Sequence, residues 1–161
     1  MSAEDYYTML VCESGHVLTD CLECSSDDSK FCDKCGARTI SACPSCGAKI
    51  RGDLIDSGVV CIGFTPVAPK YCPECGEPFP WTVASIEALR ELAELDDDLN
   101  EADREMLVES AETAMTENPK TKVSALKVKK VLSKAGKATA SAARDLLVDV
   151  LAESAKKMIW P

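Results

Sequence analysis

The sequence predicts a small β region with cysteine-rich turns, residues 1–80, followed by an all-α region of three to four helices, residues 81–161. Three observations predict this organisation. All ten cysteines of the 161-residue chain lie between Cys12 and Cys75. After residue 81, apolar residues recur every three or four positions, which is the spacing of one helix face. The chain length suits one or two small domains rather than one large catalytic fold.

Closely spaced cysteines in the first half indicate metal binding. Cys-x2-Cys pairs begin at residues 21, 32, 43 and 72, and a Cys-x3-His pair occupies residues 12–16. A gap of two residues lets both sulfurs of a short turn reach one ion, and two such turns complete a tetrahedral zinc site. Glycine follows the second cysteine of three pairs and tolerates the positive φ of such a turn. In a reducing compartment this spacing favours metal ligands or redox groups over structural disulfides.

Cys43, Cys46, Cys72 and Cys75 are predicted to form one site. Both pairs share the form Cys-Pro-x-Cys-Gly, and a proline after the first cysteine presets the turn. The residues between the pairs would form a hairpin with strands at 49–55 and 58–64 and a turn at 56–58. This pattern predicts a zinc ribbon. Cys61 lies within the second strand, where we expect a small buried hydrophobe.

The other site has more candidate ligands than positions. Cys32 and Cys35 are expected to contribute two of its four ligands. The other two are either Cys12 and His16, which give three thiolates and one imidazole, or Cys21 and Cys24, which give four thiolates.

Cys12 and His16 are the preferred choice. A glycine precedes the imidazole, which can reach the ion held by a thiolate four residues earlier, and His16 is the only histidine of the chain. Cys21 and Cys24 would then lie, reduced and partly exposed, in the loop of the first ribbon. They are the replacement ligands if His16 does not bind.

Two structural zinc ions are therefore the predicted cofactors. Thiolate spacing also fits an iron centre held by four cysteines, but paired Cys-x2-Cys turns with one histidine favour zinc. Protein fills every ligand position, so no place is left for water or substrate, and the metal would stabilise a core too small to fold alone. Because the thiolates outweigh the ion's charge, metal binding makes an acidic module more acidic.

The segment between the two regions contains Pro78 and Pro80, which disfavour both helix and strand. Phe79 and Trp81 are expected to pack against the ribbon rather than to stack on a ligand.

Helical periodicity organises the rest of the chain. Thr82 or Ser85 would cap a first helix that ends at residues 96–98, and Asn100 would cap a second that ends at residues 117–121. A lysine-rich third helix would end at Gly136, and a fourth would cover residues 139–158. The apolar residues expected on one side of these helices are, in order, Ile86, Leu89, Leu92, Ala93 and Leu95; Met106, Leu107, Ala111, Ala114 and Met115; Val123, Leu126, Val131, Leu132 and Ala135; and Ala143, Leu146, Leu147, Val150, Leu151 and Met158.

Charge is distributed unevenly. Residues 1–80 carry 6 Lys and Arg against 12 Asp and Glu, residues 81–117 carry 2 against 12, and residues 118–161 carry 10 against 3. The formal net charge of −9 disfavours a general nucleic-acid coat. The basic stretch Lys120–Lys137 offers a surface for nucleic acid or anionic lipid, but a solvated face near the acidic segment is favoured. The broadly apolar terminal helix ends in Trp160 and is expected to pair with a partner protein, a copy of itself or a membrane surface.

These features predict a non-enzymatic zinc-binding interaction module, an adaptor or regulator whose C-terminal helices bind a partner protein or self-associate. The sequence has no Ser/His/Asp set or phosphate loop. It also has no apolar run of about 20 residues and no secretory leader, so a cytoplasmic location is expected. One alternative is a nucleic-acid- or membrane-binding effector that uses Lys120–Lys137. The other alternative is thiol redox chemistry at Cys21 and Cys24.

Several motifs resemble those of a known family. They are Cys-x2-Gly-His at 12–16, Phe-Cys-x2-Cys-Gly at 31–36, Cys-Pro-x-Cys at 43–46, Ile-Arg-Gly-Asp at 50–53, Tyr-Cys-x2-Cys-Gly at 71–76, Pro-Trp-Thr at 80–82, Leu-Leu-Val-Asp-Val at 146–150 and Ala-Lys-Lys-Met-Ile-Trp-Pro at 155–161. With them the whole chain resembles an uncharacterised bacterial family, domain of unknown function 2321. The resemblance implies a double zinc ribbon followed by helices, with Cys12 and His16 as ligands of the first ribbon, and it implies almost nothing about activity. Cys21 and Cys24 depart from the family's pattern, and residues 51–53 are expected to form a turn or strand edge.

Overall fold

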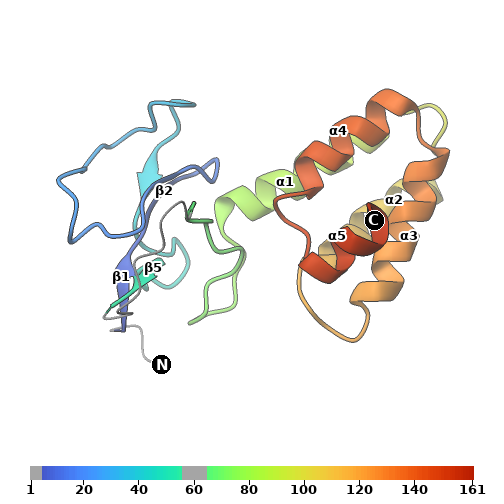
Figure 1. The fold of residues 1–161 in the computed structure, drawn as a ribbon. Coiled ribbons are helices and arrows are strands. Elements are labelled where there is room, and N and C mark those ends of the chain that lie inside the picture. Colours follow the sequence, from blue (N-terminus) through green and yellow to red (C-terminus); the bar gives the residue numbers. More distant parts are fainter. Residues whose placement is uncertain (1–4, 56–64) are drawn as a thin grey trace. The chain divides into compact units, whose positions relative to one another are not determined.

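The computed structural model describes residues 5–55 and 65–161, and the chain divides into two compact units, Met1–Val83 (unit 1) and Ala84–Pro161 (unit 2) (Figure 1). The predicted boundary lies between residues 80 and 81. The predicted strand at 58–64, with Cys61, and the turn at 56–58 lie outside the described residues.

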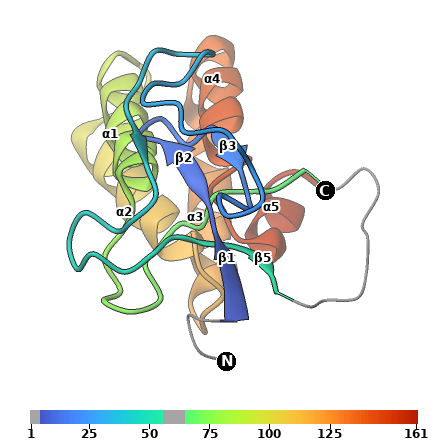
Figure 2. The same ribbon diagram turned by 90° about the vertical axis from the view of Figure 1, so that its left-hand side faces the viewer.

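Short antiparallel strands form the described part of unit 1. They are β1 (Tyr6–Thr8), β2 (Leu10–Cys12), β3 (Val17–Thr19), β4 (Thr39–Ile40) and β5 (Arg51–Leu54). One sheet pairs β1 with β5 (Figure 2), and the other has the strand order β3-β2-β4. Only Met9 separates β1 from β2, so continuous backbone joins the two sheets. The Met9 N–H donates to the Ile50 carbonyl at 2.8 Å.

The β5 strand lies within the predicted strand at 49–55, whose predicted partner at 58–64 lies outside the described residues. Within the described residues β5 pairs with β1, and Tyr6 lies opposite Leu54. Residues 6–8 were not predicted as a strand, because the segment that completes their backbone hydrogen bonds lies more than 40 positions later in the chain.

The aromatic pair before unit 2 packs against the ribbons, as predicted. Phe79 and Trp81 stack with their ring centroids 4.8 Å apart. Both belong to the small buried cluster of unit 1, whose other members are Met9, Val11, Cys43, Ile50 and Cys72. The indole N–H of Trp81 donates to the Pro69 carbonyl at 2.8 Å, so the ring's one polar group is satisfied.

The first helix, α1 (Pro80–Glu94), begins earlier than predicted. Pro80 is its first residue rather than part of a connector, because the first turn of a helix needs no N–H from that position. The Phe79 carbonyl accepts the N–H groups of Thr82 and Val83. Thr82 is therefore inside the helix, where its hydroxyl donates to the Lys70 carbonyl at 2.8 Å, and it does not cap the helix.

Four further helices complete the described part of unit 2. They are α2 (Glu101–Ala114), α3 (Thr121–Lys134), α4 (Lys137–Leu147) and α5 (Glu153–Ile159). The predicted class, a small β region followed by helices, is confirmed. Asn100 caps α2 as predicted, since its side chain accepts the Asp103 N–H at 2.8 Å.

Residues 81–161 hold five helices, not three to four, because the predicted helix at 139–158 is divided. The Ala152 N–H donates to the Ala114 carbonyl of α2 at 2.9 Å, which takes it out of a continuous helical ladder. Val150 and Leu151 of the intervening turn are buried in the core. Tertiary contacts thus override a local pattern that is helical throughout.

Most residues expected on the apolar faces are buried in one core or packed against it. Leu146 is half-buried and does not belong to that core, and four others are exposed. The exposed fractions are 81% for Leu95, 36% for Met106, 56% for Val123 and 52% for Leu126. In α3 the core side is formed by Ala125, Val128 and Leu132, which share one face at three- and four-residue spacing. This places Val123 and Leu126 on the opposite, outer side.

Asp96 rather than Leu95 turns inward where α1 ends. Its carboxylate accepts the Gly136 N–H at 2.9 Å and the Asp98 N–H at 2.8 Å. Hydrogen bonding, first from the Thr139 hydroxyl, lowers the pKa of Asp96. Since Gly136 is the residue that precedes α4, an acidic side chain from a distant segment holds the start of that helix and lies near its positive end.

The terminal helix also packs inside unit 2. Ala155 and Ile159 are buried, and Met158 and Trp160 pack against the same core. The apolar side of α5 is therefore covered by its own unit. No helix in the described ranges combines the length and the apolarity that a membrane span requires.

Candidate metal centres

The structure gathers all eight predicted metal-binding residues into two groups. The first cluster contains Cys12, His16, Cys32 and Cys35, and the second contains Cys43, Cys46, Cys72 and Cys75. In each cluster the four candidate ligand atoms lie within 4.8 Å of one another. Cys21 and Cys24, the possible replacement ligands, belong to neither.

Three turns with the same backbone geometry present six of the cysteines. The glycine N–H bonds the carbonyl of the first cysteine four residues earlier: Gly36 to Cys32 at 2.8 Å, Gly47 to Cys43 at 2.9 Å and Gly76 to Cys72 at 2.8 Å. The φ angles of these glycines are +73°, +79° and +78°, in the region that favours glycine. Repetition of one turn explains why spacing alone identified these residues.

The turn that carries Cys12 and His16 is built differently. Cys12 ends β2, and its sulfur accepts the His16 N–H at 3.3 Å. Gly15 has a φ of +92°, and a Cβ added there would lie 3.0 Å from the Cβ of Trp81. The close approach to the buried tryptophan fixes the position of the imidazole-bearing turn against the core of unit 1.

The distances between ligand atoms fit one tetrahedral ion per cluster. A tetrahedron with metal–sulfur bonds of about 2.3 Å and metal–nitrogen bonds of about 2.0–2.1 Å has S–S edges of about 3.8 Å and S–N edges of about 3.5 Å. In the first cluster Cys12 and Cys35 have their sulfurs 3.7 Å apart, and His16 Nδ1 lies 3.5 Å from Cys12 Sγ and 3.7 Å from Cys32 Sγ. In the second cluster the sulfurs are 3.8 Å apart for Cys43 and Cys75 and 3.7 Å apart for Cys46 and Cys72. Donor types and spacing both fit zinc.

Backbone hydrogen bonds, desolvation and neighbouring thiols shift the pKa values of the clustered cysteines in different directions. In the second cluster the Glu77 N–H lowers the pKa of Cys75, but desolvation and the neighbouring thiols of Cys46 and Cys72 outweigh it and raise that pKa to about 12. In the first cluster the Ala37 N–H is the main cause that lowers the pKa of Cys35 to about 6. A divalent ion at the centre would stabilise every thiolate of a cluster at neutral pH.

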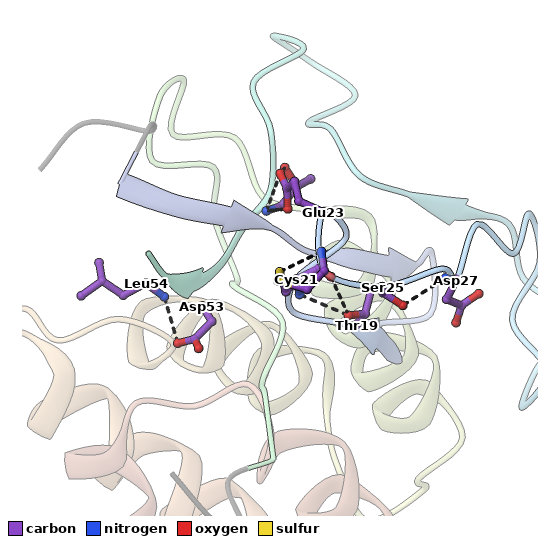
Figure 3. The surroundings of a disulfide bond; sticks show 9 residues. Thr19, Cys21, Glu23, Ser25, Asp27, Asp53 and Leu54 are labelled. Carbon is purple, nitrogen blue, oxygen red and sulfur yellow. Dashed lines mark hydrogen bonds between the residues drawn. A yellow bond between two sulfur atoms is a disulfide. The ribbon is translucent and has the colours of Figure 1, made fainter. Parts of the chain in front are cut away.

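Cys21 and Cys24 differ from the prediction in their oxidation state. They were expected to be reduced, and the structure joins them in a disulfide (Figure 3). Their Cα atoms are 5.2 Å apart, within the range that a disulfide spans. Within the described residues, both clusters have four candidate ligands without this pair.

Comparison with known proteins agrees with the motif resemblance. The model of a family described as an uncharacterised protein conserved in bacteria (DUF2321) matches residues 5–159. No curated protein matches the chain, and neither does any solved structure. The match covers both units and describes no activity.

Proposed function

Because the chain belongs to this uncharacterised bacterial family, whose description names no activity, its function has to be inferred from its own residues. We propose that it is a non-enzymatic module in which each cluster holds a structural zinc ion and the C-terminal helices bind a partner protein. The observation that carries the structural role is closure of both clusters. Four protein donors at tetrahedral distances surround each centre, so a bound ion has no free position for substrate.

The position of the histidine supports the absence of catalysis. His16 Nδ1 faces the sulfurs of Cys12 and Cys32, so the chain's one imidazole is engaged as a ligand instead of serving as a general base. The zinc would supply fixed positive charge that neutralises thiolates and ties the turns together.

Metal analysis of the purified chain should find two zinc ions per molecule, because each cluster has a complete donor set of its own. Inductively coupled plasma mass spectrometry alongside native mass spectrometry gives both the element and the count. One ion, none, or stoichiometric iron would contradict the two-zinc proposal.

The outer side of α3 is the best candidate for partner binding. We call it the basic α3 surface, and its exposed members are Lys122, Val123, Leu126, Lys127, Lys129 and Lys130. On a helical wheel the two apolar side chains lie between the lysines. Since the apolar side of α5 is buried, the docking role expected of the terminal helix is assigned to α3.

An acidic protein segment with apolar side chains fits this surface best. Lysines complement carboxylates, and Val123 and Leu126 provide apolar contact that a phosphate backbone would not use. The acidic α2 packs against α3, and Lys134 of α3 pairs with Asp103 of α2 at 2.9 Å. These acids weaken attraction to nucleic acid or anionic lipid. Two exposed apolar residues are also too few for a membrane-embedded helix face.

Replacing both apolar residues, Val123→Glu with Leu126→Glu, should remove partner binding without unfolding unit 2, because both side chains are exposed. We expect at least a tenfold loss of affinity, or about 1.4 kcal/mol. The matched control is Leu95→Glu, which also adds a charge at an exposed leucine. Proteins cross-linked to the wild type and the control, but not to the double variant, would be purified and titrated by calorimetry.

A different partner at the basic α3 surface would give a different result with the same set of variants. A dimer seen by light scattering and lost in the double variant would identify a second copy as the partner. Salt-dependent binding of duplex DNA, RNA or anionic vesicles that survives in the double variant would contradict the protein partner and favour the effector that uses Lys120–Lys137.

A further inference from the structure

The Cys-x2-Cys turn at residues 21–24 resembles the three turns that supply cysteines to the clusters, but its own cysteines belong to neither cluster. The Ser25 N–H donates to the Cys21 carbonyl at 3.1 Å, the same four-residue bond that closes the turns after Cys32, Cys43 and Cys72. Its sulfurs are joined to each other. The local geometry that elsewhere brings two candidate ligand sulfurs into a cluster thus holds here a disulfide whose Cys24 is exposed.

The turn is fastened to the strands by groups other than sulfur. The Leu22 N–H donates to the Thr8 carbonyl of β1 at 2.8 Å. The Glu23 carboxylate accepts the Thr8 N–H at 2.9 Å and the Thr8 hydroxyl at 2.6 Å. The Asp53 N–H of β5 donates to the Asp20 carbonyl at 2.9 Å. These bonds do not depend on the disulfide, so its reduction leaves the two sulfurs close together and ready to pair again.

The two sulfurs are not equivalent. Cys24 is exposed, whereas Cys21 is half-buried. The Cys24 N–H donates to Cys21 Sγ at 3.1 Å, and this donor would stabilise negative charge on Cys21. An incoming thiolate therefore meets Cys24 first, and Cys21 is the better leaving group.

We propose that Cys21 and Cys24 form a reversible dithiol–disulfide site that exchanges with a low-molecular-weight thiol and its disulfide while both metal clusters stay intact. The thiolate of the small molecule attacks Cys24 Sγ, the Cys21–Cys24 bond breaks, and Cys21 takes the electron pair. A second small thiolate attacks the small-molecule sulfur of the mixed disulfide, and Cys24 leaves with its electron pair. Two protons then neutralise the cysteines, so the protein gains two electrons and the two small thiols become one disulfide.

Separation from the clusters makes the exchange selective. The cluster sulfurs are at metal-ligand distances from one another, where a bound ion would occupy their lone pairs. Cys21 and Cys24 lie in neither cluster, so their oxidation or reduction releases no metal. The site would let the module respond to the cellular thiol pool through a surface of unit 1.

The test uses the full-length metal-loaded chain in reduced and oxidised glutathione at ratios that span roughly a thousandfold range. Free thiols are blocked with one alkylating reagent, disulfides are reduced and labelled with a second, and peptides are counted by mass spectrometry. We expect Cys21 and Cys24 to change together within this range at constant metal content. A pair that stays wholly oxidised or wholly reduced, or cluster cysteines that oxidise first with loss of metal, would overturn the proposal.

Single variants test the order of attack. In Cys21→Ser the exposed Cys24 should form a mixed disulfide with oxidised glutathione at least about tenfold faster than Cys21 does in Cys24→Ser. Equal or reversed rates would overturn the assigned roles. The double variant with both serines sets the background from Cys61 and should keep the metal content of the wild type, since the turn's backbone bonds remain.

Discussion

Removal of the metal ions should unfold unit 1 and leave the helices of unit 2 folded. Unit 1 has a small apolar cluster, two of whose members, Cys43 and Cys72, are also candidate ligands in the second cluster. Binding of a structural zinc ion is worth about 10–16 kcal/mol in small zinc domains at neutral pH. Unit 2 has its own core of aliphatic residues from all of its helices and needs no ion.

Tryptophan emission reports the two units separately. Trp81 stacks on Phe79 in unit 1, and Trp160 packs against the core of unit 2. In a Trp160→Phe background, a strong chelator should shift Trp81 emission to longer wavelength, while circular dichroism keeps most of its helical signal. Native Trp81 emission in a protein shown by mass spectrometry to be metal-free would contradict the structural role of the ions.

A ligand substitution should have the same effect on a smaller scale. Cys72→Ser removes a buried sulfur of the second cluster, so we expect one zinc ion per chain and a less stable unit 1. The control, Cys21→Ser combined with Cys24→Ser, removes two sulfurs that lie outside the clusters, and it should keep two ions. Loss of an ion from this control would mean that the replacement ligands participate after all.

The sequence was sufficient to identify the candidate metal residues because their placement is local. A Cys-x2-Cys-Gly turn is closed by hydrogen bonds within five residues, so its geometry is encoded where the cysteines stand. The Cys12–His16 pair could be found for the same reason. The disulfide of Cys21 and Cys24 could not be predicted in this way, because it depends on which Cys-x2-Cys turns come together in space to form the clusters.

Features set by distant contacts were missed. The β1 strand depends on β5, the break between α4 and α5 depends on the Ala114 carbonyl, and the start of α4 is held by Asp96. Likewise the core side of α3 buries the polar Thr121 and Ser124, so the periodicity of apolar residues alone did not show that Val123 and Leu126 face outward. Tertiary packing selects among local patterns that the sequence leaves equivalent.

Replacing Gly52 by alanine should strongly destabilise unit 1, although the change adds only one methyl group. Gly52 lies in β5, where a Cβ would overlap the Asp20 carbonyl oxygen and would lie 3.1 Å from the Tyr7 carbonyl oxygen. The Asp20 oxygen cannot move away freely, because it accepts the Asp53 N–H at 2.9 Å. Relief of the overlap requires displacement of backbone in both segments, so we expect a loss of about 3 kcal/mol in the free energy of unfolding.

Denaturant unfolding followed by Trp81 emission, again in the Trp160→Phe background, would measure this loss. Free zinc must be buffered at one concentration, because metal binding adds to apparent stability. The matched control is Gly136→Ala, where the added Cβ would lie 3.6 Å from Asp96 Oδ2, an ordinary contact, so unit 1 should unfold as in the parent. We expect the Gly52→Ala protein to retain two zinc ions because the atoms nearest to the added methyl group belong to Asp20 and Tyr7, which are not cluster residues. A change below about 0.5 kcal/mol would show that the approach of Asp20 to β5 is not rigid, and the fixed turn on which exchange at Cys21 and Cys24 depends would lose its support.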